Sequence, residues 1–215
     1  MPYPVTYSIQ RPERYNRVTV LFRWVLAIPL YLLFSSWSTV AEHTNGLIGG
    51  SGPLSGLLGL LILYAWVVIM LTGRFPASMR STAIMLFRWL ANIEAYLLLL
   101  ADPFPPFGEG EYPLNLGIIP AEQYNRLTVF FRVILAIPHY IILFFLGIAA
   151  VVLTIVAWFA ILFTAQYPQS MYDFNVGVAR WGIRVGAYLD LLVDEYPPFS
   201  LSEETGEAGL QPQTA

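Results

Sequence analysis

The sequence contains no cysteine and no lysine, and only 12% of its 215 residues are charged. Without cysteine the chain has no disulfides, no thiolate nucleophile and no cysteine-ligated metal. Without lysine, arginine is the only strongly basic side chain, and the formal net charge of −3 predicts no general attraction to nucleic acid. Soluble domains carry about 25% charged residues. Half that share, together with 57% hydrophobic residues, indicates an integral membrane protein.

One stretch of 17 residues occurs twice, at positions 15–31 and again at positions 124–140. The copies read YNRVTVLFRWVLAIPLY and YNRLTVFFRVILAIPHY, 109 positions apart. Farther along the chain the similarity continues at an offset of 92, so the first copy carries 17 additional residues. An internal repeat determines how the whole chain is interpreted. The expected units are a first repeat at 1–107 with a loop insertion at about 41–57, a second repeat at 108–200, and a disordered acidic tail at 201–215.

The predicted fold is all-α and membrane-embedded, with two pseudo-twofold repeats. Each repeat is expected to hold a short strand, a transmembrane helical hairpin and an amphipathic interfacial helix. The strands are expected at 3–9 and 112–118, because apolar residues alternate there with period two. Equivalent strands of the two repeats could pair with each other.

The hairpin helices are expected at 16–40 with 54–72, and at 125–146 with 148–164. The first apolar run lies too far from the start for a cleavable signal peptide and should remain as a membrane helix. In the second repeat, one continuous helix would be about 57 Å long, while the hydrocarbon core is about 30 Å thick. A tight turn near Gly147 is therefore the preferred interpretation, with one long, tilted or kinked helix as the alternative.

The third helix of each repeat is expected at 78–100 and at 170–193. The arginines in these segments make them poor solitary spans, which favours helices that lie at the membrane surface. If the third helices lie at the surface, the protein has four membrane spans in two parallel repeats. If the third helices cross the membrane, it has six spans in two inverted repeats. Arginines flank the outer ends of the first hairpin and none lies in its inserted loop. This asymmetry predicts a multi-pass protein of the bacterial inner membrane with both termini in the cytoplasm.

Five arginines are the candidate contacts for lipid headgroups or for a partner protein, since guanidinium groups bind phosphates. They are Arg23, Arg88, Arg132, Arg180 and Arg184. The ordinary alternative is that they reach the membrane surface and set the topology. Glu94 could neutralise Arg88 or a neighbour, and Asp102 and Asp194 are expected to cap or terminate the third helices.

His139 follows a proline inside an apolar stretch, and its counterpart in the first repeat is Leu30. A packed or hydrogen-bonded histidine is the ordinary interpretation, and an axial ligand to haem or a chlorophyll-type pigment is the alternative. Gly182 and Gly186 match the small-xxx-small pattern of closely packed helices. No nucleophile–base pair, phosphate loop or metal-ligand motif is present in the sequence, so we expect no enzyme, no metal and no cofactor.

The second repeat, from LAIPHYIILFFLGIAAVV through VARWGIRVGAYLDLLVDEYPPFSL, resembles a bacterial membrane family of unknown function, domain-of-unknown-function family 4389. The first repeat resembles a diverged second copy. The resemblance implies a multi-pass membrane protein and carries over no catalytic residues. We expect a scaffold or accessory subunit of a larger membrane complex. Its expected partners are membrane lipids, other membrane protein subunits and, in an oligomer, further copies of itself. The alternatives are a protein that binds lipid headgroups or transports a small solute, and pigment or haem binding through His139.

Overall fold

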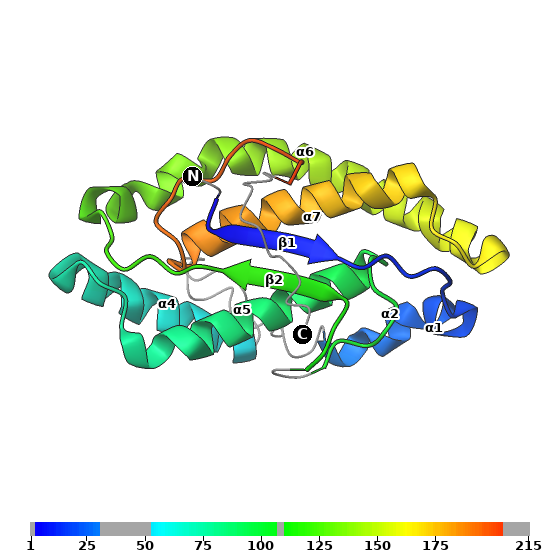
Figure 1. Ribbon diagram of the computed structural model, residues 1–215, viewed down its shortest axis with the longest axis horizontal. Helices are drawn as coiled ribbons and strands as arrows, with labels where there is room; N and C mark the ends of the chain where they lie inside the picture. The colour runs from blue at the N-terminus through cyan, green and yellow to red at the C-terminus, as the bar shows by residue number, and fades with distance from the viewer. Residues whose placement is uncertain (1–2, 31–52, 107–109, 204–215) are drawn as a thin grey trace, which may run out of the picture.

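The computed structural model describes residues 3–30, 53–106 and 110–203, and within these ranges it is mostly helical with one small sheet (Figure 1). Most of the predicted loop insertion and of the predicted tail lies outside these residues. Three residues assigned to the tail, 201–203, lie inside them, however, and two of these bond to the last helix. The backbone carbonyls of Leu201 and Ser202 accept hydrogen bonds from arginines of the last helix, so an ordered chain continues past the predicted boundary.

The two predicted strands form and pair with each other. Strands β1 (Val5–Ile9) and β2 (Leu114–Ile118) are antiparallel, and Tyr7 lies opposite Leu116 at the centre of the pair. Since 7 plus 109 is 116, each of these residues faces its own counterpart in the other repeat. Antiparallel strands are related by a local twofold axis perpendicular to the sheet. The register therefore centres the pseudo-twofold axis of the molecule on this residue pair.

The helices follow the repeat, with one important difference from the predicted hairpins. The first repeat holds α1 (Arg17–Leu21), α2 (Arg23–Leu26), α4 (Pro53–Thr72) and α5 (Ala77–Leu97). The second holds α6 (Arg126–Thr164) and α7 (Gln169–Leu189). Helix α6 is continuous over 39 residues, so the predicted turn near Gly147 is wrong and the alternative of one long helix is correct. Residues 31–40 of the first predicted hairpin lie outside the described residues, and its second helix, expected at 54–72, is α4.

The packing of α6 explains why it does not turn. Its buried residues recur every three or four positions on both sides of Gly147 and form one stripe: Val129, Arg132, Ala136, His139, Ala150, Thr154, Ala157 and Ile161. Such spacing is one face of a single helix, and this helix packs against α7. Pro138 is accommodated inside it. A hairpin would divide the stripe and remove half of α6 from α7.

Among the residues that the structure describes, α6 is the one helix that is long and apolar enough to cross a membrane. In α4 the apolar segment over Gly59–Thr72 is shorter. Of the four spans expected from the sequence, one candidate is thus identified by length and composition.

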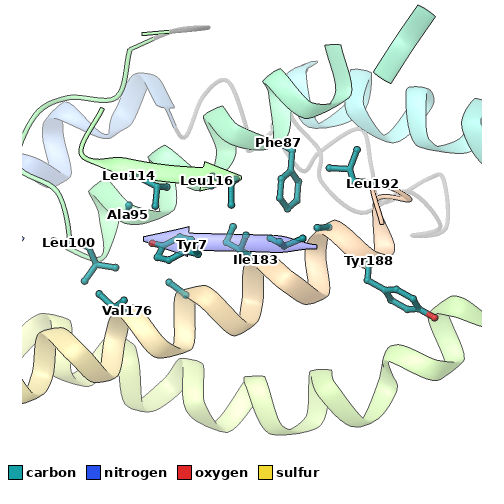
Figure 2. Packing of buried hydrophobic residues seen from close by; sticks show 14 of the residues in the cluster. Tyr7, Phe87, Ala95, Leu100, Leu114, Leu116, Val176, Ile183, Tyr188 and Leu192 are labelled. Carbon is teal, nitrogen blue, oxygen red and sulfur yellow. The ribbon is translucent and has the colours of Figure 1, made fainter. Parts of the chain in front are cut away.

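The sheet lies over the junction of the two third helices. Both views place α7 between β1 and α6, and α5 lies on the β2 side (Figures 1 and 2). Tyr7, Leu116 and Ile183 belong to the core that fills this space (Figure 2). A Cβ at Gly186 would lie 3.3 Å from the ring of Phe87 on α5. The expectation that this glycine face meets a neighbouring helix is confirmed.

Candidate functional site

Arg23 forms the centre of a buried polar cluster in the first repeat. Its guanidinium donates to the carbonyl oxygens of Tyr96 at 2.9 Å and Ala101 at 2.8 Å, and it pairs with Asp102 Oδ1 at 3.0 Å. The same group lies 4.2 Å from the centre of the Tyr96 ring. We call Arg23, Asp102, Tyr96 and the Ala101 carbonyl the first arginine corner.

The second repeat builds the same cluster from the equivalent residues. Arg132 donates to the carbonyl oxygens of Tyr188 and Val193, pairs with Asp194 Oδ1 at 2.6 Å, and lies 4.2 Å from the centre of the Tyr188 ring. These four residues are the second arginine corner. The match of every partner at offsets of 109 and 92 shows that the repeat in the sequence is also a repeat in geometry.

Each corner joins the start of the first helix of its repeat to the chain that follows the third helix. The second oxygen of Asp102 accepts from the backbone N–H of Asn16 at 3.1 Å, and Asp194 does the same for Asn125 at 3.0 Å. Both asparagines cap their helices with their side chains. The aspartates therefore orient the cap residues of α1 and α6, whereas the sequence assigned them to the ends of the third helices.

The chain reaches each corner through a leucine with positive φ. Leu99 has φ 62° and Leu191 has φ 60°, equivalent positions just after α5 and α7. This conformation is uncommon for a residue with a branched side chain. Both leucines are buried, and each lies between the end of the third helix and the next carbonyl that the arginine binds, that of Ala101 or Val193. The corners stabilise the fold. The repeat in the sequence did not by itself show that these arginines and aspartates form ion pairs.

Arg23 and Arg132 are 3% and 2% exposed. A guanidinium that is buried and bonded within its own chain has little surface left for a phosphate. The bonds described for these two arginines thus favour a structural role, and a lipid or partner contact stays a prediction that their surroundings do not support.

Arg180 and Arg184 are also held by the chain itself. Arg180 donates to the carbonyls of Tyr7 on β1, at 3.2 Å, and Leu201, at 2.9 Å. Arg184 is 2% exposed and donates to the carbonyl of Ser202. The segment at 200–203 therefore covers this face of α7 and fastens it to the sheet.

Arg88, the counterpart of Arg180, lies in different surroundings. It is exposed and lines a cavity of about 790 Å³ between α5 and the sheet. The other polar side chains of this cavity include Asn92, Ser8, Asn115 and Glu111. Within the described residues Arg88 has no hydrogen bond or ion pair, so the predicted neutralisation of Arg88 by Glu94 is wrong. Of the five candidate arginines, Arg88 is the one that faces an open polar cavity.

Glu94 lies instead on the opposite side of α5. It lines an apolar groove of about 500 Å³ whose other walls include Leu90, Leu97 and Gly182. Burial raises the pKa of Glu94 to about 7. The same cause raises the pKa of Asp190, after α7, to about 7. These two carboxyl groups favour the neutral form, as expected of acids in apolar surroundings.

His139 is completely buried in an aromatic cluster. Its Nδ1 accepts a hydrogen bond from the Trp181 indole at 3.1 Å, and the Phe199 ring is stacked on it at 3.9 Å. With Nδ1 as acceptor, the neutral imidazole carries its proton on Nε2, and Nε2 is buried as well. This environment leaves no open side at which a haem or pigment could reach the imidazole, and it fits a packed histidine. Among the described residues no group of three potential ligands could hold a metal.

Comparison with known proteins identifies one domain. Residues 126–200 match the model of a domain of unknown function (DUF4389), and no second copy is detected. The predicted resemblance of the second repeat to this family is thus confirmed, and the predicted resemblance of the first repeat to it is not. No match was found among the curated proteins or the solved structures.

Proposed function

We propose that this protein is a non-catalytic membrane protein that acts as a scaffold or accessory subunit of a larger complex in the bacterial inner membrane. The arginine-bearing helix ends lie on the cytoplasmic side. The observation that carries the proposal is the outer surface of α6. Between residues 127 and 163 the single charged side chain is Arg132, and it is buried.

The exposed side chains of α6 are large and apolar along its whole length. Phe144 is 64% exposed, Phe145 is 65% exposed and Phe163 is 79% exposed. Soluble monomers rarely expose contiguous apolar patches larger than a few hundred Å². A surface of this kind requires lipid or another apolar protein surface around it.

The polar groups of the interior support a structural function. The two arginine corners use their guanidinium and carboxylate groups to hold helices to the chain, and His139 is packed among aromatic rings. The charged and polar atoms of these groups bond to, or pack against, other parts of the same chain, which leaves them no free position for a substrate. The protein offers apolar surface, which is what a packing subunit contributes to an assembly.

Photo-crosslinking tests this function. A photoreactive phenylalanine analogue is placed at Leu63 and at Phe163, which are 49% and 79% exposed, and as a control at Phe87, which is 4% exposed. We expect discrete protein adducts of reproducible mass at an exposed position and none at Phe87. Adducts with lipid alone at both exposed positions would contradict a scaffold function.

The cavity at Arg88 supports a second candidate function, the binding of a zwitterionic lipid headgroup. Arg88 would pair with the phosphate and Glu111, which lines the same cavity, with the ammonium group. The test is lipid retention by purified protein after exposure to phosphatidylethanolamine vesicles. Arg88→Gln should lower retention, whereas Arg74→Gln, which removes an exposed charge outside the cavity, should leave it unchanged. Equal retention by both variants would refute this candidate.

A further inference from the structure

The two ends of α6 lie at the same height along the pseudo-twofold axis. The start of α6 adjoins the end of α4, because the N–H of Tyr124 donates to the carbonyl of Gly73 at 3.0 Å. The equivalent bond, from Tyr15 to Ala165 at 3.0 Å, joins the start of α1 to the end of α6. The twofold rotation carries the start of α6 onto the start of α1 without a change of height. Since the start of α1 adjoins the end of α6, this helix runs across the axis.

This geometry leaves two orientations in a bilayer. A crossing α6 requires the axis to lie in the membrane plane. If the axis is parallel to the membrane normal, α6 lies along the membrane and both its ends face the same side. The orientations differ in where they place the sheet, which lies on the axis near the middle of the molecule's long dimension (Figure 1).

The crossing orientation places polar groups at the bilayer centre. Ser8 and Asn115 on the exposed face of the sheet, and the exposed Arg88, would lie near the midplane. Polar side chains without partners are costly in hydrocarbon, and an arginine at the centre of a helix costs about 2.5–3.5 kcal/mol on insertion scales. The length of α6, about 58 Å at about 1.5 Å per residue, also exceeds the hydrocarbon thickness of about 30 Å.

The parallel orientation agrees with the two faces of α5. Met85, Arg88 and Asn92 line the polar cavity on the sheet side, and they recur at the spacing of one helix face. Leu90 and Leu97 line the apolar groove and project from the opposite face. One side of this layer therefore suits water and headgroups, and the other suits hydrocarbon.

We propose that α6 lies along the bilayer and does not cross it, with both ends at the same membrane surface, the sheet facing the water and the middle of the helix in hydrocarbon. This inference rests on the proposed membrane location. The interaction surface is the middle of the exposed apolar side of α6, and its partner is the acyl region of the bilayer, which leaves the ends of the helix and α4 for a protein partner.

Cysteine labelling tests the orientation in a chain that has no cysteine of its own. Single cysteines replace Gln123 and Gln166, exposed residues just before and just after α6, and Gly147 at its middle, where an added Cβ meets no atom within 4 Å. Right-side-out and inverted membrane vesicles are treated with a membrane-impermeant maleimide, with detergent-solubilised protein as the reference.

We expect Gln123→Cys and Gln166→Cys to react from the same side, and Gly147→Cys to react only after solubilisation. Reaction of the two end positions from opposite sides would show that α6 crosses, and would overturn this inference while leaving the membrane function intact. Failure of both ends to react in either kind of vesicle, with full reaction in detergent, would also overturn it. Release of the protein by alkaline carbonate would overturn the membrane function as well.

Discussion

The two repeats are alike at their arginine corners and differ in the surroundings of the equivalent arginines on their third helices. Both arginine corners keep the same guanidinium, carboxylate, carbonyl and aromatic partners. Fourteen residues before the aspartate of its own corner, however, Arg88 lines an open cavity, while Arg180 at the equivalent position is bonded to Tyr7 and Leu201. The comparison separates the residues that the module needs in order to fold from those that are free to differ between copies.

The largest effect is expected from opening an arginine corner. Removal of one partner leaves the other charge buried without compensation, which costs about 3–5 kcal/mol. Asp194→Ala and Asp102→Ala should both lower the free energy of unfolding by this amount, measured by denaturation in mild detergent. Glu122→Ala, which removes an exposed carboxylate, is the control. A large loss in one repeat and none in the other would show that the corners are not equivalent.

A smaller effect is expected from the paired arginines of the third helices. Arg180→Gln breaks hydrogen bonds of a charged group and should destabilise the protein by about 1.5–3 kcal/mol. Arg88→Gln removes an exposed charge and should change stability by less than about 0.5 kcal/mol. Thermal unfolding of the two variants under the same conditions measures the difference. Equal losses would mean that Arg88 is also held by the fold.

His139→Leu gives the second repeat the residue that the first repeat has. Leu30 packs beside Trp89 in the first repeat, whereas His139 accepts a hydrogen bond from Trp181. The substitution leaves a buried indole N–H without its acceptor, at a cost of about 1–3 kcal/mol. In a double-mutant cycle with Trp181→Phe, the loss from His139→Leu should become smaller. Additive losses would show that this hydrogen bond contributes no coupling.

The smallest effect is a pH dependence of the free energy of unfolding that arises from Glu94. The second repeat has Gly186 at the equivalent position and therefore no such group. The pKa of Glu94 is about 7 in the folded protein, against an ordinary value of 4.5. Between these values the unfolded chain releases its proton and the folded chain keeps it, so stability falls as pH rises from about 4.5 to about 7. Glu94→Gln should reduce this fall, measured by unfolding at a series of pH values. Because Asp190 acts in the same direction, a smaller slope should remain, and an unchanged slope would contradict the assignment.

Much of the fold follows from local patterns in the sequence. The period-two alternation identified both strands, and the internal offset identified which segments are equivalent. The arginine corners could not be found in this way, because Asp102 lies 79 residues after Arg23 and only the folded chain brings them together. The coincidence of a repeated arginine and a repeated aspartate was the available signal.

The predicted turn in α6 failed because it assumed that an apolar helix must cross the membrane at right angles. The burial stripe from Val129 to Ile161 has helical spacing and continues past Gly147. Glycine destabilises a helix by only about 1 kcal/mol, which packing along α7 readily offsets. The surroundings of Arg88 and Arg180 could not be distinguished at all, because both follow the same local pattern and differ only in what covers them.

The pairing of Tyr7 with Leu116 places a strand against its own duplicate. This is the contact of an isologous dimer, in which one surface patch is complementary to itself. Joining the two copies in one polypeptide replaces a bimolecular association with an intramolecular one, so the pairing no longer depends on protein concentration. Each copy is also free to mutate separately, so a single chain can combine a covered arginine in one half with an open one in the other, which identical subunits cannot do.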